Sequence, residues 1–355
     1  MTRIGIIGLG FMGMIHYYGA KKVEGCQVTA ICTRDPKKLS GDWSSIQGNF
    51  GPRGGIEDLS GVSTYDQIDD LLADPNVDLV DICLPTQYHK EVTIAALKAG
   101  KHVLCEKPIE VDIQSANEMV AVSEQSEKHF MVAHVLPFFP EFNYALKAVQ
   151  SGEHGDLLGL HLRRLISQPS ERTLQEITKS GAPGIDLHIH DTHFIQLLCG
   201  MPSAVFSQGK IATTEDGKNT QFVDYLSTQY IYPERPQLAV STWSGGISAK
   251  GRSFSHGFEI FFEKATLTFS SSTLGGQGVS QPLTLIQNTG DVYYPDLGEV
   301  DPVDAFTNEI DYAISHLNSG QSADSGFLSG TKARDALALC YKEAESVITG
   351  KIVTI

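Results

Sequence analysis

The sequence TRIGIIGLGFMG at residues 2–13 joins a short apolar run to three closely spaced glycines. The apolar residues 4–7 predict a buried strand of a parallel sheet. The glycines follow the pattern G-x-G-x-x-G, which lets the backbone turn tightly and approach a pyrophosphate. Residues 14–22 are predicted to form the next helix, whose free N–H groups and dipole favour a bound phosphate. The motif therefore predicts a dinucleotide site. Its contacts are expected from Gly8, Gly10, Phe11, Met12 and Gly13.

Length and composition indicate a folded protein of more than one domain. The chain has 355 residues, of which 41% are hydrophobic and 19% are charged. This balance is typical of globular enzymes, and the length exceeds that of one ordinary core. The formal net charge of -15 argues against nucleic acid or an anionic membrane as the main partner, because both would repel the protein. A small polar molecule is the expected partner.

The sequence also predicts a cytoplasmic location. No apolar run approaches the length of a membrane span, and residues 1–13 are assigned to a strand and loop rather than to a signal peptide. The six cysteines lack C-x-x-C spacing, and three of them lie in strand-like apolar runs. We therefore expect reduced thiols.

Residues 1–133 alternate between strand-like and helix-like segments, which predicts an α/β fold with an N-terminal Rossmann domain and a doubly wound parallel sheet. The predicted strands are residues 4–7, 28–32, 79–84, 102–105 and 130–133. Helices are predicted at residues 87–99 and 113–126, because Gly100 and Asp112 supply suitable stop and start signals.

Residues 134–355 follow a different pattern. Alternating runs between residues 204 and 286 predict a large open, mostly antiparallel sheet, and helices are predicted at 141–150, 304–317 and 332–349. We expect a C-terminal α+β domain for substrate binding and oligomerisation. An open sheet leaves one face to be covered, so a homodimer or homotetramer is expected.

The residues after the second strand bear on the choice of cofactor. In folds that bind NAD, an acidic residue about 20 positions beyond the glycines usually contacts the ribose. Here that position is Thr33, followed by Arg34. The missing carboxylate and the added positive charge favour NADP slightly over NAD. Two alternatives stay open: Arg34 could stack on adenine, and Asp35 could take the acidic role.

Two further segments follow predicted strands at the carboxyl edge of the sheet, where open α/β folds bind ligands. Leu84, Pro85 and Thr86 end one strand, and Glu106-Lys107-Pro108 follows the next. Lys107 is expected near the nicotinamide. A surface lysine beside a turn-forming proline is the plainer alternative for such an isolated pair.

Taken together, these motifs resemble those of the glucose-fructose oxidoreductase, inositol dehydrogenase and MocA family of NAD(P)-dependent oxidoreductases. The resemblance is carried by the glycine loop, Leu84-Pro85-Thr86 with His89, Glu106-Lys107-Pro108, and Asp186 four residues before His190. It implies cofactor contacts from Leu84, Pro85, Thr86, His89, Glu106 and Lys107. It also implies that Lys107 bonds the reacting oxygen and that Asp186 and His190 complete the catalytic set, with His190 carrying the proton.

The chemistry of these residues supports the same roles. Oxidising a carbinol releases a proton to a base, and imidazole titrates near neutral pH. A helix from Pro183 to Gly200 would place Asp186, His190 and His193 on one face. A lysine would stabilise developing alkoxide charge. Substrate contacts are therefore expected from Lys107, Asp186, His190, His193 and Arg163.

The chain departs from the family pattern at His188 and His193, where many relatives carry glycine and aspartate, so substrate contacts can differ. Histidines clustered with Asp186 and Asp191 also raise a metal site. His188 and His190 point about 200° apart around a helix, which disfavours this, and we expect no metal. His16 is expected to be a packing or loop residue.

The sequence thus predicts an NAD(P)-dependent dehydrogenase or reductase acting on CH–OH groups of a sugar, cyclitol or related compound. One alternative is a lyase or glycosidase-like enzyme that uses tightly bound NAD(P) in transient redox. A second alternative is a non-catalytic dinucleotide-binding sensor. Neither the substrate nor the physiological direction follows from the sequence.

Overall fold

The computed structural model describes residues 1–48, 50–298, 301, 303–322 and 324–355. The chain divides into two compact units. The first consists of Met1–Phe139 and Val300–Arg334, and the second of Pro140–Glu299 and Asp335–Ile355. The first unit therefore includes a late segment of the chain, whereas the sequence pattern groups that segment with the C-terminal domain.

The first unit contains a six-stranded parallel sheet with the strand order β3-β2-β1-β4-β5-β6. Its strands are β1 (Thr2–Ile7), β2 (Cys26–Cys32), β3 (Ser63–Tyr65), β4 (Leu79–Ile82), β5 (His102–Glu106) and β6 (Phe130–Ala133). The predicted Rossmann sheet is confirmed. The sequence analysis missed β3, because this short edge strand has no apolar run.

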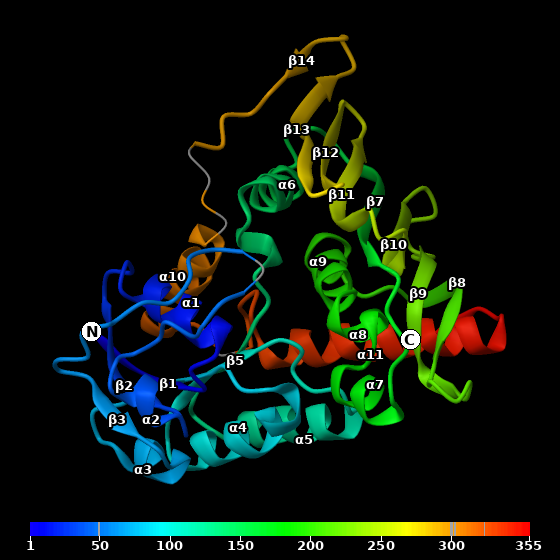
Figure 1. The fold of residues 1–355 in the computed structure, drawn as a ribbon. Coiled ribbons are helices and arrows are strands. Elements are labelled where there is room, and N and C mark those ends of the chain that lie inside the picture. The colour runs from blue at the N-terminus through cyan, green and yellow to red at the C-terminus, as the bar shows by residue number, and fades with distance from the viewer. Residues whose placement is uncertain (49, 299–300, 302, 323) are drawn as a thin grey trace. The chain divides into compact units, whose positions relative to one another are not determined.

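Helices cover both faces of this sheet (Figure 1). The helices described in this unit are α1 (Phe11–Ala20), α2 (Pro36–Leu39), α3 (Ile68–Ala73), η1 (Thr86–Tyr88), α4 (His89–Lys98), α5 (Ile113–Glu124), η2 (Leu136–Phe138) and α10 (Asp304–Asn318). Helix α1 packs against α10, and α4 packs against α5. The Asp112 carboxylate caps α5 by accepting the Ser115 N–H at 2.8 Å, as the sequence predicted.

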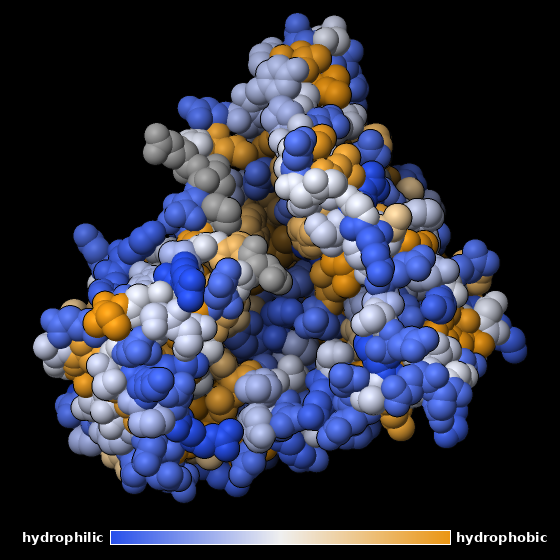
Figure 2. Space-filling view, in the orientation of Figure 1, coloured by the Kyte–Doolittle hydropathy of each residue, from blue (hydrophilic) through white to orange (hydrophobic). Residues whose placement is uncertain are grey.

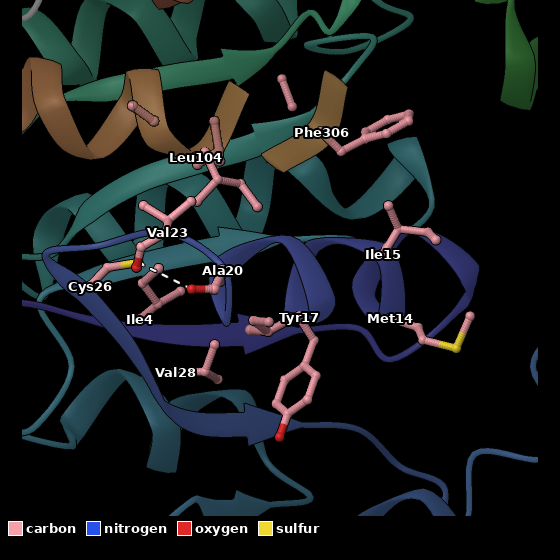
Figure 3. Close-up of a cluster of buried hydrophobic side chains, with 14 of the residues drawn as sticks. Ile4, Met14, Ile15, Tyr17, Ala20, Val23, Cys26, Val28, Leu104 and Phe306 are labelled. Carbon is pink, nitrogen blue, oxygen red and sulfur yellow. Dashed lines mark hydrogen bonds between the residues drawn. The ribbon is translucent and has the colours of Figure 1, made fainter. Parts of the chain in front are cut away.

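Alternation along the central strands sorts the apolar side chains between the two faces. Ile4 and Ile6 join the core formed by α1 and α10, whereas a side chain at Gly5 would meet Leu71 and Val77 on the other face. Figure 3 shows the first of these cores, with Phe306 of α10 and Ile15 of α1 on the same side of the sheet.

The second unit contains a nine-stranded sheet with the order β14-β13-β12-β11-β7-β10-β9-β8-β15. Its strands are β7 (Leu157–Ser167), β8 (Ala204–Thr213), β9 (Asn219–Ile231), β10 (Ala239–Ser248), β11 (Arg252–Phe262), β12 (Ala265–Leu274), β13 (Gln277–Gln287), β14 (Val292–Tyr293) and β15 (Val353–Thr354). The pair β7/β10 is parallel and the other described pairs are antiparallel. The prediction of a mostly antiparallel open sheet is confirmed.

One face of this sheet carries helices. The remaining helices of the chain are α6 (Pro140–Ser151), α7 (Leu174–Ser180), α8 (Pro183–Asp186), α9 (Ile189–Cys199) and α11 (Gly330–Thr349). The other face exposes Trp243, Phe261 and Ile286. Phe261 and Ile286 both lie opposite Thr266, so they share this face. Figure 2 shows hydrophobic side chains at the surface over the β12–β14 end of the sheet.

Within the described part of the chain, no helix combines the length and apolar character that crossing a bilayer requires. All six cysteines are free thiols, and five of them are buried.

Candidate dinucleotide and catalytic site

The three glycines after β1 have different surroundings. Gly8 has a positive φ of 96°, and a Cβ there would lie 2.6 Å from the Cys83 carbonyl oxygen. A Cβ on Gly13 would lie 2.1 Å from the Gly8 carbonyl oxygen. These two glycines are thus required by the close packing of the loop. A Cβ on Gly10, by contrast, would meet no atom of the described residues within 4 Å.

The start of α1 is suited to an anion. Gly10 is its N-cap, and among the described residues no side chain caps this end and no acidic residue lies in the first turn. The first N–H groups of a helix have no partner within the helix. Phe11 and Met12 are half-buried residues of that turn. The loop therefore offers backbone donors and open space at Gly10, which fits a pyrophosphate.

The residues at the end of β2 are those that the sequence analysis expects to face the adenosine part of the cofactor. Thr33 is half-buried and Arg34 is exposed. The Asp35 carboxylate caps the short helix α2 by accepting the Lys37 N–H at 3.0 Å. Lys38 Nζ donates to the Leu9 carbonyl oxygen of the glycine loop at 2.8 Å. Arg34 and Lys37 are thus exposed cations in this segment.

The segments after β4 and β5 are joined by His89. Its Nδ1 lies 2.9 Å from the Pro108 carbonyl oxygen, and its Nε2 lies 2.8 Å from the Leu84 carbonyl oxygen. The side chain is buried at the start of α4. His89 is therefore placed to hold the Leu84–Thr86 loop against the loop that follows Lys107.

Lys107 follows β5 directly and is half-buried. Its backbone N–H donates to the Glu106 carboxylate at 3.0 Å. Strands β1, β4 and β5 are neighbours in the sheet. Since adjacent strands lie about 4.8 Å apart, the glycine loop and Lys107 are two strand spacings from each other at one edge.

Asp186 and His190 lie on either side of a break between two helices. Asp186 ends α8 and is exposed, and His190 is the second residue of α9 and is half-buried. The prediction of one continuous helix was wrong here, because the His188 N–H bonds to the Pro183 carbonyl oxygen five residues earlier. Helix α8 does begin at Pro183, and Gly200 ends α9 with a φ of 74°. His193 lies one turn further and is fully buried.

A chain of buried charges surrounds the start of α9. Arg164 Nε donates to Asp191 Oδ1 at 2.9 Å, and His188 Nδ1 lies 3.7 Å from Asp191 Oδ2. On the other side of the ring, His188 Nε2 lies 2.7 Å from the Glu343 carboxylate on α11. These interactions connect β7, α9 and α11 within the second unit.

The protonation of His188 follows from this arrangement. Burial opposes the charged ring, but the carboxylates of Glu343 and Asp191 outweigh burial and raise the pKa of His188 to about 9. Burial alone would raise the pKa of the Asp191 carboxyl. Arg164 and His188 outweigh burial, and the pKa is lowered. Two cations thus alternate with two acidic side chains in the core.

Alternation along β7 separates the two neighbouring arginines. Arg164 is buried on the face that carries α9. Arg163 points to the opposite face, where its Nη2 donates to the Ser270 hydroxyl at 2.8 Å. This placement argues against the prediction that Arg163 contacts the same substrate as His190, and Arg164 is the arginine that reaches the helix.

Comparison with known proteins identifies the family. Residues 2–134 match the model of the GFO/IDH/MocA oxidoreductase family with its NAD-binding Rossmann fold, and residues 142–268 match the GFO/IDH/MocA C-terminal domain. The chain belongs to this family. The resemblance predicted from the motifs is therefore confirmed, as is the NAD-binding character of the first unit.

Individual relatives of the family agree with this assignment. Inositol 2-dehydrogenase of Corynebacterium glutamicum is 34% identical over 164 residues, 45% of this chain and 45% of that protein. The first relatives found are matched over only about half of their length. Inositol 2-dehydrogenase of Rhizobium meliloti is 25% identical over 100% of this chain and 99% of that protein. A probable dehydrogenase from Thermotoga maritima shares the fold, with a TM-score of 0.74, 23% identity and coverage of 99% and 98% of the two chains.

Because a side chain at Gly10 would enter open space, the dinucleotide site can be tested without disturbing the fold. Gly10 has a φ of -91°, which valine tolerates. We expect Gly10→Val to raise the dissociation constant for NAD by about 100-fold, or roughly 2.7 kcal/mol, as measured by fluorescence titration. Gly278→Val on β13 is the matched control, since its Cβ also meets no described atom within 4 Å, and it should bind NAD normally. Unchanged NAD affinity in Gly10→Val would contradict the assignment.

Proposed function

We propose that the chain is an NAD(P)-dependent dehydrogenase that oxidises a hydroxyl group of a cyclitol, sugar or related polyol. Lys107 binds the reacting oxygen and stabilises its developing negative charge. His190 takes the hydroxyl proton, and Asp186 helps to hold the substrate and the imidazole. The nicotinamide, when bound, accepts the hydride. His193 is proposed as a further substrate contact.

The observation that carries this proposal is the arrangement at the carboxyl edge of the first sheet. The open glycine loop follows β1, the Leu84–Thr86 loop follows β4, and Lys107 follows β5, the next strand along. An amine at this edge lies beside the place where open α/β sheets bind dinucleotides. If Lys107 were only a surface residue, its backbone N–H would not have to be bound by the buried Glu106 carboxylate.

The substrate class is tested with a panel of inositols and aldoses, each assayed with NAD and with NADP while absorbance of the reduced cofactor is followed. We expect turnover with at least one cyclitol or sugar. Arg34 predicts a slight preference for NADP. Consumption of a substrate without net reduction of the cofactor would instead support the transient-redox alternative. No reaction with any member of the panel would contradict the proposed substrate class.

We further propose that two subunits associate through the exposed face of the nine-stranded sheet, as a homodimer or within a homotetramer. Trp243 and Phe261 are 48% and 42% exposed on this face, and an open sheet face that exposes large apolar side chains is often covered by a partner. Light scattering of the purified protein tests this, and a monomeric mass would overturn it. We also propose that the protein is located in the cytoplasm.

A further inference from the structure

Five titratable side chains lie together in the core of the first unit, beneath the carboxyl edge of the sheet. They are His16 of α1, Asp81 of β4, Cys83 just after β4, Glu106 of β5 and Glu309 of α10. His16 and Glu309 are completely buried, and Asp81 and Glu106 nearly so. Buried charges are costly unless they are paired. The burial of these five groups together therefore needs a physical explanation.

Both ring nitrogens of His16 face carboxylates. Nδ1 lies 2.9 and 3.1 Å from the two Asp81 oxygens, and Nε2 lies 3.2 Å from Glu106 Oε1. A neutral imidazole has one N–H and one lone pair. In either neutral tautomer the lone pair would point at a carboxylate, which is repulsive. The imidazolium donates a hydrogen bond from Nδ1 to Asp81 and places its positive charge 3.2 Å from Glu106 at Nε2, an ion-pair contact without hydrogen-bond geometry, so this arrangement favours the charged ring.

The neighbouring groups are consistent with one positive charge in the cluster, which lies on the His16 ring between the two carboxylates. Burial would lower the pKa of His16, but Asp81 and Cys83 together outweigh burial, and the pKa is raised well above its ordinary value. Burial raises the pKa of the Cys83 thiol, which stays neutral. Burial also raises the pKa of Glu309 well above its usual range. Among the described residues, neither oxygen of Glu309 has a hydrogen-bond partner, as expected for a neutral acid.

Glu106 connects this cluster to Lys107. One carboxylate oxygen contacts His16, and the other accepts the backbone N–H of Lys107 at 3.0 Å. We propose that His16 is a permanently protonated positioning residue, which pairs with the Glu106 carboxylate and through it fixes the main chain at Lys107. The inference rests on the proposed function in one respect, namely that the position of Lys107 matters for turnover. A displacement of about 1 Å can cost roughly 100-fold in rate.

A bound metal ion is the other use such a cluster could have. His16, Asp81 and Cys83 offer ligand atoms within 4.8 Å of one another. Two ligands on a tetrahedral zinc ion, with bonds of about 2.0–2.1 Å, lie roughly 3.3 Å apart. The 2.9 Å separation of His16 Nδ1 and Asp81 Oδ2 is instead that of a charge-assisted hydrogen bond. The geometry favours a proton between these atoms.

The protonation state is tested by NMR of protein labelled with ¹⁵N-histidine, at pH values from 6 to 9. We expect both ring nitrogens of His16 to be protonated throughout, with the signals assigned by their loss in His16→Gln. A neutral tautomer at pH 7 would overturn the proposal. So would stoichiometric zinc that is present in the wild type and lost in both His16→Gln and Cys83→Ser.

The positioning role is tested by hydrogen exchange at the Lys107 amide. In His16→Gln this amide should exchange at least about tenfold faster than in the wild type, because Glu106 loses its charged partner. His102→Gln, at the opposite end of β5, is the matched control and should leave the exchange rate unchanged. Equal exchange in the wild type and His16→Gln would overturn the positioning role. This measurement needs no substrate, so it separates failure of this inference from failure of the proposed function.

Kinetics provide a second test once a substrate is found. His16→Gln and Glu106→Gln should each lower kcat by about 10–100-fold, KM for NAD should change less than about twofold in His16→Gln, and the double variant should be no worse than the single ones. Additive losses in the double variant, or an unchanged kcat in His16→Gln, would contradict action through Glu106.

Discussion

Replacing His190 by asparagine is expected to lower kcat/KM for cyclitol or sugar oxidation by about 10²–10⁴-fold, the usual contribution of a general base. Asparagine retains a polar group near the position of the ring but cannot accept the hydroxyl proton. His190 is half-buried at the start of α9, so the change should leave the fold intact. Steady-state kinetics with the substrate found in the panel measure the effect, and NAD titration should give an unchanged dissociation constant.

The control for this prediction is His161→Asn. His161 is also half-buried in the second unit, but it lies on β7 and bonds the Ser241 hydroxyl at 2.9 Å. Its sequence neighbour Leu162 faces the core, so alternation places His161 on the face away from α9. We expect His161→Asn to retain activity within about threefold. If His190→Asn were as active as His161→Asn, the imidazole at 190 would not be the base. Lys107→Ala should show a loss similar to that of His190→Asn.

The predictable part of the fold is the part that short-range patterns encode. The strand at residues 130–133 and the capped helix from Ile113 were predicted at their observed start, because apolar runs and an N-cap residue are local signals. The glycine motif likewise predicts its own loop. The grouping of α10 with the first unit was not predictable in this way, since it depends on packing between segments nearly 300 residues apart.

The buried acids show most clearly what the sequence analysis overlooked. Glu309 lies on the same helical stripe as Phe306, Ile310 and Ala313, all of which are buried. Glu343 similarly shares a stripe with Leu339 and other buried residues of α11. A charged residue on an apolar stripe is a visible signal, but its partner cannot be read from the sequence. His16 was expected to be a packing residue for the same reason, because Asp81 and Glu106 come from other elements.

The directions in which the candidate site residues point could not be predicted from their spacing in the sequence alone. Asp186 and His190 are four residues apart, which suggests one helical face, yet a break at Leu187 and His188 separates α8 from α9. Arg163 and Arg164 are adjacent in sequence, and the strand sends them to opposite faces. In each case the local backbone decides the direction of the side chain, and the chemistry of the residue type does not.

Glu343→Gln is expected to destabilise the protein by about 3–5 kcal/mol, the usual result of removing one partner from a buried ion pair. The His188 ring and the Glu343 carboxylate are both completely buried and lie 2.7 Å apart. Without this carboxylate, the charged ring keeps the 3.7 Å contact to Asp191 and a 3.4 Å contact to the neutral Tyr230 hydroxyl. Glu345→Gln on the same helix is the control. Glu345 is exposed and pairs with Lys342 at 3.4 Å, so its loss should cost less than about 1 kcal/mol.

The same pair predicts how stability depends on pH. The folded-state pKa of His188 is about 9, above the ordinary value of 6.5, so folding favours the protonated ring. The resulting stabilisation is fully present below about pH 6.5 and is lost as pH rises through about 9. It amounts to roughly 3 kcal/mol for a shift of this size. Urea denaturation at pH 6.5 and pH 9.5, followed by circular dichroism, should therefore show a fall in unfolding free energy for the wild type and Glu345→Gln. In Glu343→Gln the fall should be smaller by about this amount, because the carboxylate that raises the pKa of His188 is gone, whereas the contribution of protonated His16 is the same in all three proteins. An equal fall in all three proteins would mean that the pH dependence arises elsewhere.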